Sequence, residues 1–248
     1  MISIKSTREI ELMRTAGRIV AETHELLREA IRPGITTLEL DVIAEAYIRK
    51  SGGIPAFKGY NGFPASICSS INEQVVHGIP GHIELKDGDI IGIDIGAFYE
   101  GYCGDAARSY GIGQIDDEKK KLLRVTEESF FAGIKHALAG NRLSDISHAV
   151  QKHVESNGFS VVRDLVGHGI GREMHEDPQI PNYGMPHKGP RLAAGMALAV
   201  EPMVNQGRYA VKVLKDGWTV VTADGKPSAH YENTILITSG EPEILTLL

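Results

Sequence analysis

Four acidic residues lie in sequence surroundings that otherwise predict buried β-strands. Asp94 lies within DIIGIDIG, Glu201 follows the apolar run MALAV, and Glu232 opens the run ENTILI. Asp105 follows GYCG, whose glycines indicate a turn or bulge, and a hairpin would bring Asp94 and Asp105 onto adjacent strands. A buried carboxylate is costly unless it is paired or binds a metal. Any one of these acids alone is best explained as solvated or salt-bridged, but four together favour a shared site.

A fifth residue, His168, supplies a nitrogen ligand to this predicted site. It lies between two glycines in VGHGI, although a single histidine in such a position is more often structural. Clustered carboxylates repel one another unless a cation compensates their charge. Four carboxylates and one imidazole suit two divalent ions of hard or borderline character that share bridging acids. The residues therefore predict a metal-dependent hydrolase.

The segments between these residues carry the signals of four helices, each closed by glycine or proline. The helices are predicted over residues 6–31, 36–51, 117–139 and 144–157. In the first two, a Ser or Thr followed three residues later by Glu forms a possible capping box. The apolar runs that contain the acids are short, β-branched and bounded by glycine, which is typical of strands.

The second half of the chain repeats the layout of the first. Gly34 and Gly140, which follow helix ends, lie 106 residues apart. The segments LKDGDIIGID and LAAGMALAVE align Asp94 with Glu201 at an offset of 107. Because helix ends and a strand keep nearly one offset, we expect a single catalytic domain of α+β class. It would consist of two duplicated halves, about residues 1–110 and 111–248.

One motif departs from this offset. HGI begins at His77 and again at His168, but the second copy lies farther from the strand that follows it. The extra length contains His175 and several prolines. A long loop inside a compact domain is more often functional than idle, so the sequence singles out His175.

Composition excludes several classes of protein. The net charge of −6 argues against a nucleic-acid-binding protein, which needs a basic face. The first twenty residues lack the apolar core of a signal peptide, and no stretch approaches the roughly 20 apolar residues of a membrane span. Cys68 and Cys103 are the only cysteines and lack CxxC spacing, which argues against a disulfide scaffold or a zinc–thiolate site. We expect a cytoplasmic protein that does not bind nucleic acid or membranes.

At this point the chain resembles the type I methionine aminopeptidases of the pita-bread metallopeptidase family, in their short bacterial form. The resemblance rests on VHGIPG, IDIGAFYEGYCGDAAR, GHGIGREMHEDPQIPNY, MALAVEPM and AHYENTILI, which occur in order along the whole chain. It implies a fold of two pseudo-symmetric α/β halves around a curved antiparallel sheet. It also implies removal of the N-terminal, initiator methionine from nascent proteins and peptides when the second residue is small.

The resemblance assigns roles to the five predicted ligands. Asp94 would hold one metal, Asp105 and Glu232 would bridge two metals, and His168 and Glu201 would complete the second site. The two ions would activate a water for attack on the first peptide bond. Manganese, iron, cobalt and zinc all remain open as the physiological metal, because such a site accepts each of them.

The resemblance also implies residues that act on the substrate. His77 would lie beside the scissile amide, His175 would donate to the substrate carbonyl, and Glu201 would double as the acid and base. Five residues would line an apolar methionine pocket: Tyr60, Phe63, Cys68, Met174 and Trp218. Two of these keep ordinary alternatives, since Trp218 could cap a hairpin and Cys68 could be an inert core thiol.

The sequence departs from the family pattern at four positions near these motifs. Asn61, Phe63 and Met174 replace a histidine, a tyrosine and a phenylalanine of many relatives, and Asn233 replaces a common histidine. The metal ligands are untouched, so the departures concern the pocket shape, the surroundings of Glu232 and the rate.

Two other functions remain as alternatives. An Xaa-Pro aminopeptidase or prolidase would share the fold, but those enzymes usually carry an extra N-terminal domain for which His77 falls too early. A non-enzymatic binding protein on the same scaffold would usually have lost metal ligands, and all five are present here. The expected partner is a peptide or nascent chain that begins with methionine. We expect a monomer, and docking on the ribosome stays open.

Overall fold

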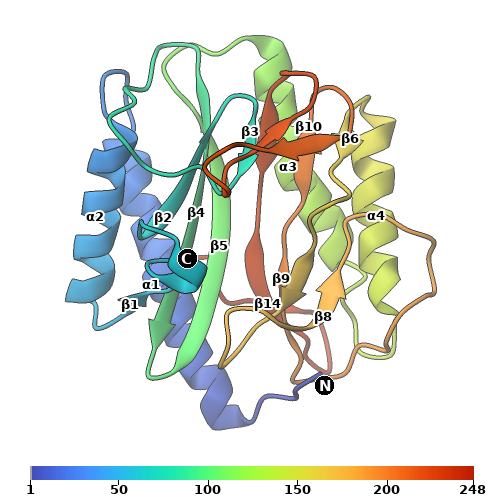
Figure 1. Cartoon of the computed structure of the whole chain (residues 1–248). Helices are drawn as coiled ribbons and strands as arrows, with labels where there is room; N and C mark the ends of the chain where they lie inside the picture. Colours follow the sequence, from blue (N-terminus) through green and yellow to red (C-terminus); the bar gives the residue numbers. More distant parts are fainter. Residues whose placement is uncertain (1) are drawn as a thin grey trace.

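The computed structural model describes residues 2–248 and has two similar halves side by side (Figure 1). Each half contributes strands to the middle of the molecule and a pair of helices to its outside. The helices are α1 (Thr7–Ala30), α2 (Thr37–Lys50), α3 (Asp117–Ile134) and α4 (Leu143–Ser156). α1 packs against β4 and β5, and α3 packs against α4 and β13. Among the described residues, none of the helices combines the length and apolar character needed to cross a membrane.

The strands form antiparallel sheets. In the first half they are β1 (Ile54–Pro55), β2 (Ile67–Ile71), β3 (Gln74–Val76), β4 (Ile90–Tyr99) and β5 (Tyr102–Gly111). In the second half they are β6 (Ser160–Val161), β7 (Gly167–Gly169), β8 (Glu176–Ile180), β9 (Ala197–Val200), β10 (Met203–Asn205), β11 (Val211–Val213), β12 (Val220–Thr222), β13 (Ser228–His230), β14 (Asn233–Leu236) and β15 (Glu243–Ile244). β4 pairs with β1, β2 and β5, and a five-stranded sheet has the order β15-β14-β9-β7-β8.

Local sequence explains where three of the four helices begin and end. Ser6 caps α1 and Thr36 caps α2, each within the predicted capping box. α4 matches its prediction to within a residue at each end. The predicted end of α3 at residue 139 is wrong, because the helix ends at Ile134. After Ile134 the backbone forms turns, in which the N–H groups of His136 and Ala137 donate to the carbonyls three residues before them. These turns bury Ala137 in the hydrophobic core of the second half.

The predicted proline-rich loop is partly a strand. Glu176–Ile180 forms β8, which pairs with β7 at the edge of the five-stranded sheet. Pro178 has no N–H to give to a ladder, and an edge strand is where a sheet tolerates this. His175 lies directly before β8, so a strand anchors the segment that carries it.

A hydrogen-bonded pair of residues joins the two halves of the sheet. Ala107 on β5 and Glu232, between β13 and β14, exchange two backbone hydrogen bonds of 3.3 and 2.9 Å. β5 also packs closely on α1, because a Cβ on Gly104 would lie only 2.8 Å from the Gly17 nitrogen. These contacts make the curved antiparallel surface continuous from one half to the other.

Equivalent positions in the halves share an unusual backbone conformation. Gly34 and Gly140 have φ of 88° and 97°, and Gly88 and Gly195 both have φ of 90°. Glycine adopts this left-handed region without the strain that a side chain would add. The agreement supports the predicted repeat and its boundary near residue 110, which stay predictions.

Candidate metal centre and substrate pocket

Strand register places three of the predicted acids in one row across the sheet. Cys68 on β2 pairs with Asp94 on β4, and Asp94 pairs with Ala107 on β5. Ala107 pairs in turn with Glu232, and the β9–β14 ladder ends at Val200 and Asn233, the residues next to Glu201 and Glu232. Directly paired residues of antiparallel strands point to the same face. The carboxylates of Asp94, Glu232 and Glu201 therefore share one face, and the small side chain of Ala107 leaves room between them.

A second row, two residues along each strand, contains the other two predicted ligands. Asp105 lies two residues before Ala107, and its backbone N–H donates to the Thr234 hydroxyl at 3.0 Å. That hydroxyl donates back to the Asp105 carbonyl at 2.9 Å. Ala199 pairs with both Thr234 and His168. Because side chains alternate with a period of two, Asp105 and His168 project from the same face as the first row.

The environment of the cluster opposes negative charge. Asp105 and Glu232 are 4% and 2% exposed, and burial raises the pKa of each well above its usual value, with repulsion between the acids adding to the effect. Burial likewise raises the pKa of Glu201, and it raises that of Asp94 to about 7. Burial lowers the pKa of His168 to about 4, so this imidazole is neutral at pH 7 and its nitrogen can bind a metal.

The unsatisfied oxygens of the cluster fit bound cations. Among residues 2–248, no hydrogen-bond donor reaches Asp94 Oδ1, Asp105 Oδ1 or Glu232 Oε1, all of which are buried. Ligand atoms of Asp105, His168 and Glu232 lie within 4.8 Å of one another. His168 Nε2 also lies 3.5 Å from Glu201 Oε1. Buried, unpaired carboxylates are expected where a divalent ion supplies the missing positive charge.

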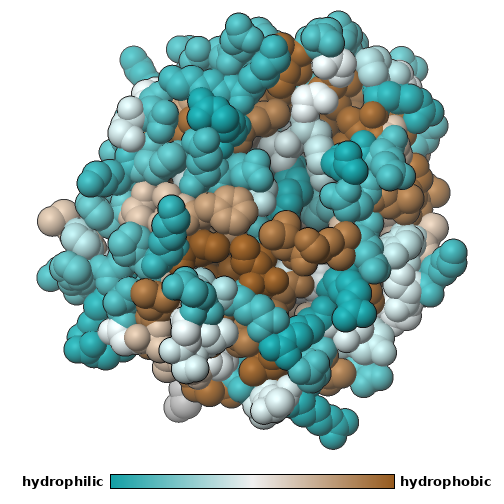
Figure 2. Space-filling view, turned by 180° about the vertical axis from the view of Figure 1, so that it is seen from behind, coloured by the Kyte–Doolittle hydropathy of each residue, from teal (hydrophilic) through white to brown (hydrophobic). Residues whose placement is uncertain are grey.

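All the predicted site residues lie around one cavity of about 370 Å³. Its lining residues are Phe57, Tyr60, Asn61, Phe63, Cys68, His77, Asp94, Asp105, His168, Met174, His175, Glu201, Trp218 and Glu232. Only Phe57 among them was not singled out from the sequence. A larger cavity of about 590 Å³ lies between α1 and α3 and contains none of the predicted site residues. From behind, the surface is mostly hydrophilic, with apolar residues gathered near its middle (Figure 2).

Two further histidines lie beside the carboxylates. The His175 ring packs against that of His168, with ring centroids 4.3 Å apart. His175 Nδ1 also makes a 2.8 Å hydrogen bond with the Tyr60 hydroxyl, which leaves Nε2 for another partner. His77 has a φ of 59°, and side-chain-bearing residues held in this region are frequent at functional sites.

Part of the cavity lining is apolar. Phe63, Cys68 and Met174 are each at most 5% exposed, and the Phe63 ring meets Trp218 edge-on with centroids 5.1 Å apart. Trp218 also follows the predicted turn, where its N–H donates to Asp216 Oδ1 at 2.9 Å. Trp218 therefore lines the cavity and also follows the turn at Asp216. Burial beside carboxylates raises the pKa of the Cys68 thiol, which keeps it protonated and apolar.

Comparison with known proteins identifies the family. A family model described as metallopeptidase family M24 matches residues 11–239. The chain belongs to metallopeptidase family M24. It is 62% identical to a methionine aminopeptidase of Clostridium perfringens over 248 residues, which cover 100% of both chains. The crystal structure of a methionine aminopeptidase from Thermotoga maritima matches with a TM-score of 0.99 and 50% identity, also over 100% of both chains.

More distant solved structures share the fold. An X-Pro aminopeptidase from Thermotoga maritima matches with a TM-score of 0.76 and 26% identity, and this chain spans 62% of its length. These matches confirm the predicted resemblance to type I methionine aminopeptidases and the pita-bread fold. They also confirm that this M24 protein is a metal-dependent hydrolase.

Sequence reasoning missed two residues next to the metal cluster of this M24 protein. His230 is 3% exposed, and burial lowers its pKa to about 3. It lies two residues before Glu232, so the period-two pattern could have placed it on the same face. Arg108 donates to the carbonyls of Ala107 and Glu232 and to Asn233 Oδ1. Asn233, one of the noted departures, thus helps to hold the strand that carries Glu232.

Proposed function

We propose that this chain removes the N-terminal methionine from peptides and nascent proteins whose second residue is small. The observation that carries the proposal is that one cavity is lined both by the carboxylate cluster and by the apolar side chains of Phe63, Cys68, Met174 and Trp218. A hydrolytic centre beside a pocket for one unbranched apolar side chain suits cleavage after a single residue. The methionine aminopeptidases at 62% and 50% identity support the choice of methionine.

The residues of the cluster suit two divalent ions. Asp94, Asp105, His168, Glu201 and Glu232 would hold them, with the identity of the metal open among manganese, iron, cobalt and zinc. Two such ions supply a nucleophilic water near neutral pH and polarise the scissile carbonyl. The unpaired oxygens of the cluster support this ligand set.

The remaining polar residues would handle the substrate and its protons. The raised pKa of Glu201 suits a group that takes a proton from the attacking water and passes it to the leaving amine. His175 would donate from Nε2 to the substrate carbonyl, since the Tyr60 hydroxyl binds its other ring nitrogen. His77, on the same cavity, would contact the scissile amide.

The pocket supports methionine as the first residue. Its walls offer aromatic edges from Phe63 and Trp218 and polarizable sulfur from Cys68 and Met174. Sulfur–aromatic contacts contribute roughly 0.3–1.5 kcal/mol each. Tyr60 completes the lining. We further propose that the enzyme acts as a monomer in the cytoplasm. Its two free, buried cysteines support the cytoplasmic location, where thiols stay reduced.

A peptide panel tests this function against the nearest alternative. The metal-replete enzyme should release methionine from Met-Gly, Met-Ala and Met-Ser peptides and act poorly when the second residue is bulky. Xaa-Pro peptides test for the activity named for the X-Pro aminopeptidase of the same fold. Hydrolysis of Xaa-Pro peptides without release of methionine would overturn the proposal. Asp105→Ala is the control, because loss of a buried ligand should abolish activity in either case.

A further inference from the structure

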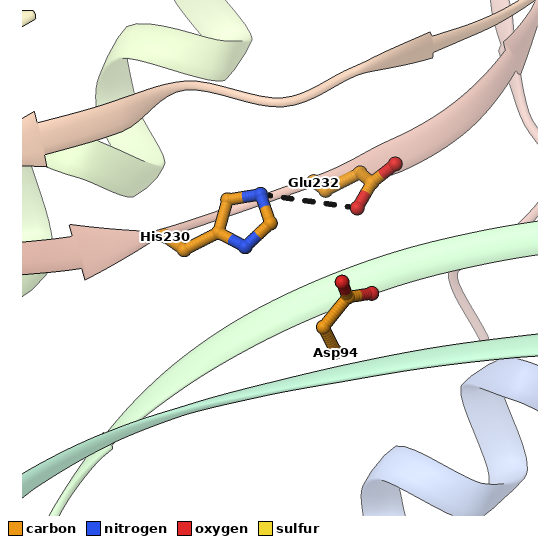
Figure 3. A group of neighbouring side chains, drawn as sticks. All are labelled: Asp94, His230 and Glu232. Atoms are coloured by element: carbon orange, nitrogen blue, oxygen red, sulfur yellow. Dashed lines mark ion pairs between the residues drawn. The ribbon is translucent and has the colours of Figure 1, made fainter. Parts of the chain in front are cut away.

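His230 is a buried imidazole whose nitrogen points at the carboxylate cluster without a partner. Its Nε2 lies 3.8 Å from Glu201 Oε2 and 3.9 Å from Glu232 Oε2. Within residues 2–248, no hydrogen bond reaches this atom. Figure 3 shows the ring of His230 and the carboxylates of Asp94 and Glu232 around a common space. Ligand atoms of these three residues lie within 4.8 Å of one another.

The separations suit coordination better than hydrogen bonding. A hydrogen bond between nitrogen and oxygen requires about 2.7–3.2 Å. The separations of 3.8 and 3.9 Å are too long for such a bond, but two atoms this far apart could both bind one cation between them. His168 Nε2 lies at a comparable distance, 3.5 Å, from Glu201 Oε1. His230 is therefore placed toward the carboxylates much as His168 is.

The sheet holds His230 in the way it holds Asp105. The Ser109 hydroxyl accepts from the His230 N–H at 2.9 Å and donates to the His230 carbonyl at 2.9 Å. The Thr234 hydroxyl makes the same two bonds with Asp105, at 3.0 and 2.9 Å. Asp105 and Thr234 lie on one side of the pair Ala107–Glu232, each two residues from the member on its own strand. Ser109 and His230 lie at the same separations on the other side. The two arrangements are thus related by a local two-fold axis between β5 and the β13–β14 segment.

A glycine of β4 lies beside His230. Gly92 pairs with Ser109, and a Cβ on Gly92 would lie 3.9 Å from His230 Cβ, in ordinary van der Waals contact. By the two-fold relation His230 occupies the position that corresponds to Asp105, and its Nε2 faces Glu201 and Glu232.

We propose that His230 is a sixth metal ligand, which gives the centre a second imidazole on the side of Asp94. The inference rests on the proposed dinuclear function. His230 would join Asp94 and Glu232 around one ion, and Asp105, His168 and Glu201 would hold the other together with Glu232. An imidazole on each ion favours borderline metals such as iron, cobalt and zinc over hard ions that prefer oxygen ligands only.

Nuclear magnetic resonance of the metal-loaded protein tests this directly. Protein labelled with ¹⁵N-histidine and loaded with two equivalents of ¹¹³Cd²⁺ should show ¹¹³Cd–¹⁵N splitting on two imidazole nitrogens. His230→Gln should remove one split signal and leave the one from His168. His153→Gln, a half-buried residue on α4 remote from the cluster, should leave both split signals. Calorimetric titration with Co²⁺ should show that His230→Gln weakens binding of one ion roughly 10–100-fold.

The outcomes separate the inference from the proposed function. Splitting on His168 alone in the unaltered protein, with two ions bound and methionine released from Met-Ala, would overturn the role of His230 and leave the function intact. Unchanged Co²⁺ affinity in His230→Gln would also overturn it, since a glutamine that only donates a hydrogen bond would then suffice. Binding of fewer than two ions by the unaltered protein would overturn the dinuclear centre itself.

Discussion

Metal binding by this protein should release protons, and more of them at low pH. The pKa of Asp94 rises from 3.8 to about 7 because the group is buried. That rise corresponds to roughly 4 kcal/mol against the ionised form in the metal-free protein. At about pH 6 the Asp94 carboxyl therefore holds a proton that a cation must displace. The imidazole of His168, with a pKa of about 4, holds none at this pH.

The magnitude follows from the number of displaced protons. Each proton that the metal displaces lowers the apparent association constant about tenfold for each pH unit below the pKa. Asp94 alone, half protonated at pH 7, predicts roughly a fivefold loss of affinity between pH 7 and pH 6. Asp105, Glu201 and Glu232 also have raised pKa values, so the loss should be larger than this. Above the pKa the carboxylates are already ionised, and the release should fall.

Isothermal titration calorimetry with Mn²⁺ measures the release. The titration is repeated at about pH 6 and pH 8 in two buffers with different enthalpies of ionisation, whose difference in heat gives the protons released. Asp94→Asn should lower the release at pH 6, whereas Asp117→Asn, an exposed acid on α3, should not change it. Equal heats in the two buffers at pH 6 would show that the cluster is ionised without a cation and would refute the reasoning.

Three further predictions concern the ligands, the pocket and the fold. Asp105→Ala should lose bound metal and activity together, whereas His175→Ala should keep its metal and lose turnover. Metal analysis and kcat on Met-Ala check both variants. Equal activity in the parent and both variants would contradict the mechanism. Trp218→Ala removes a sulfur–aromatic contact with the methionine side chain worth roughly 0.3–1.5 kcal/mol, so KM for methionine peptides should rise roughly two- to tenfold, and an unchanged KM would exclude Trp218 from the pocket. Gly104→Ala puts a Cβ 2.8 Å from the α1 backbone and should cost about 1–3 kcal/mol of unfolding free energy in a thermal melt. Gly81→Ala, with open space around its Cβ, is the matched control and should melt like the parent.

The residue types of the site could be predicted because they break a local pattern. A carboxylate at Asp94, Glu201 or Glu232 interrupts an apolar strand, and such an exception is visible without any structure. The expectation that a hairpin places Asp94 and Asp105 on adjacent strands also rests on local information and agrees with the register of β4 and β5. Of the two glycines that indicated a turn or bulge, Gly101 lies in the turn between β4 and β5 with a φ of 82°, whereas Gly104 lies inside β5 where α1 approaches closely.

Features set by contacts between distant segments were beyond local patterns. No signal between residues 134 and 140 stops α3, and its end follows from the packing of Ala137. β8 exists because β7 offers it an edge, which a proline-rich sequence does not reveal. His230 escaped notice because it stands in SAHY, a segment whose position is set by its pairing with β10 and by hydrogen bonds to Ser109 of β5, about 120 residues earlier.

The local two-fold axis explains why a duplicated sheet forms an asymmetric centre. It relates Asp94 to Glu201 at the ends of one row, and both are carboxylates. It relates Ala107 to Glu232 in the middle of that row, where only one half supplies an acid. A second acid at Ala107 would add another buried negative charge and fill the space between the strands. The same axis relates Asp105 to His230, so that one half supplies an anion and the other a neutral ligand at equivalent places. This difference between the two halves limits the charge that two cations would have to balance.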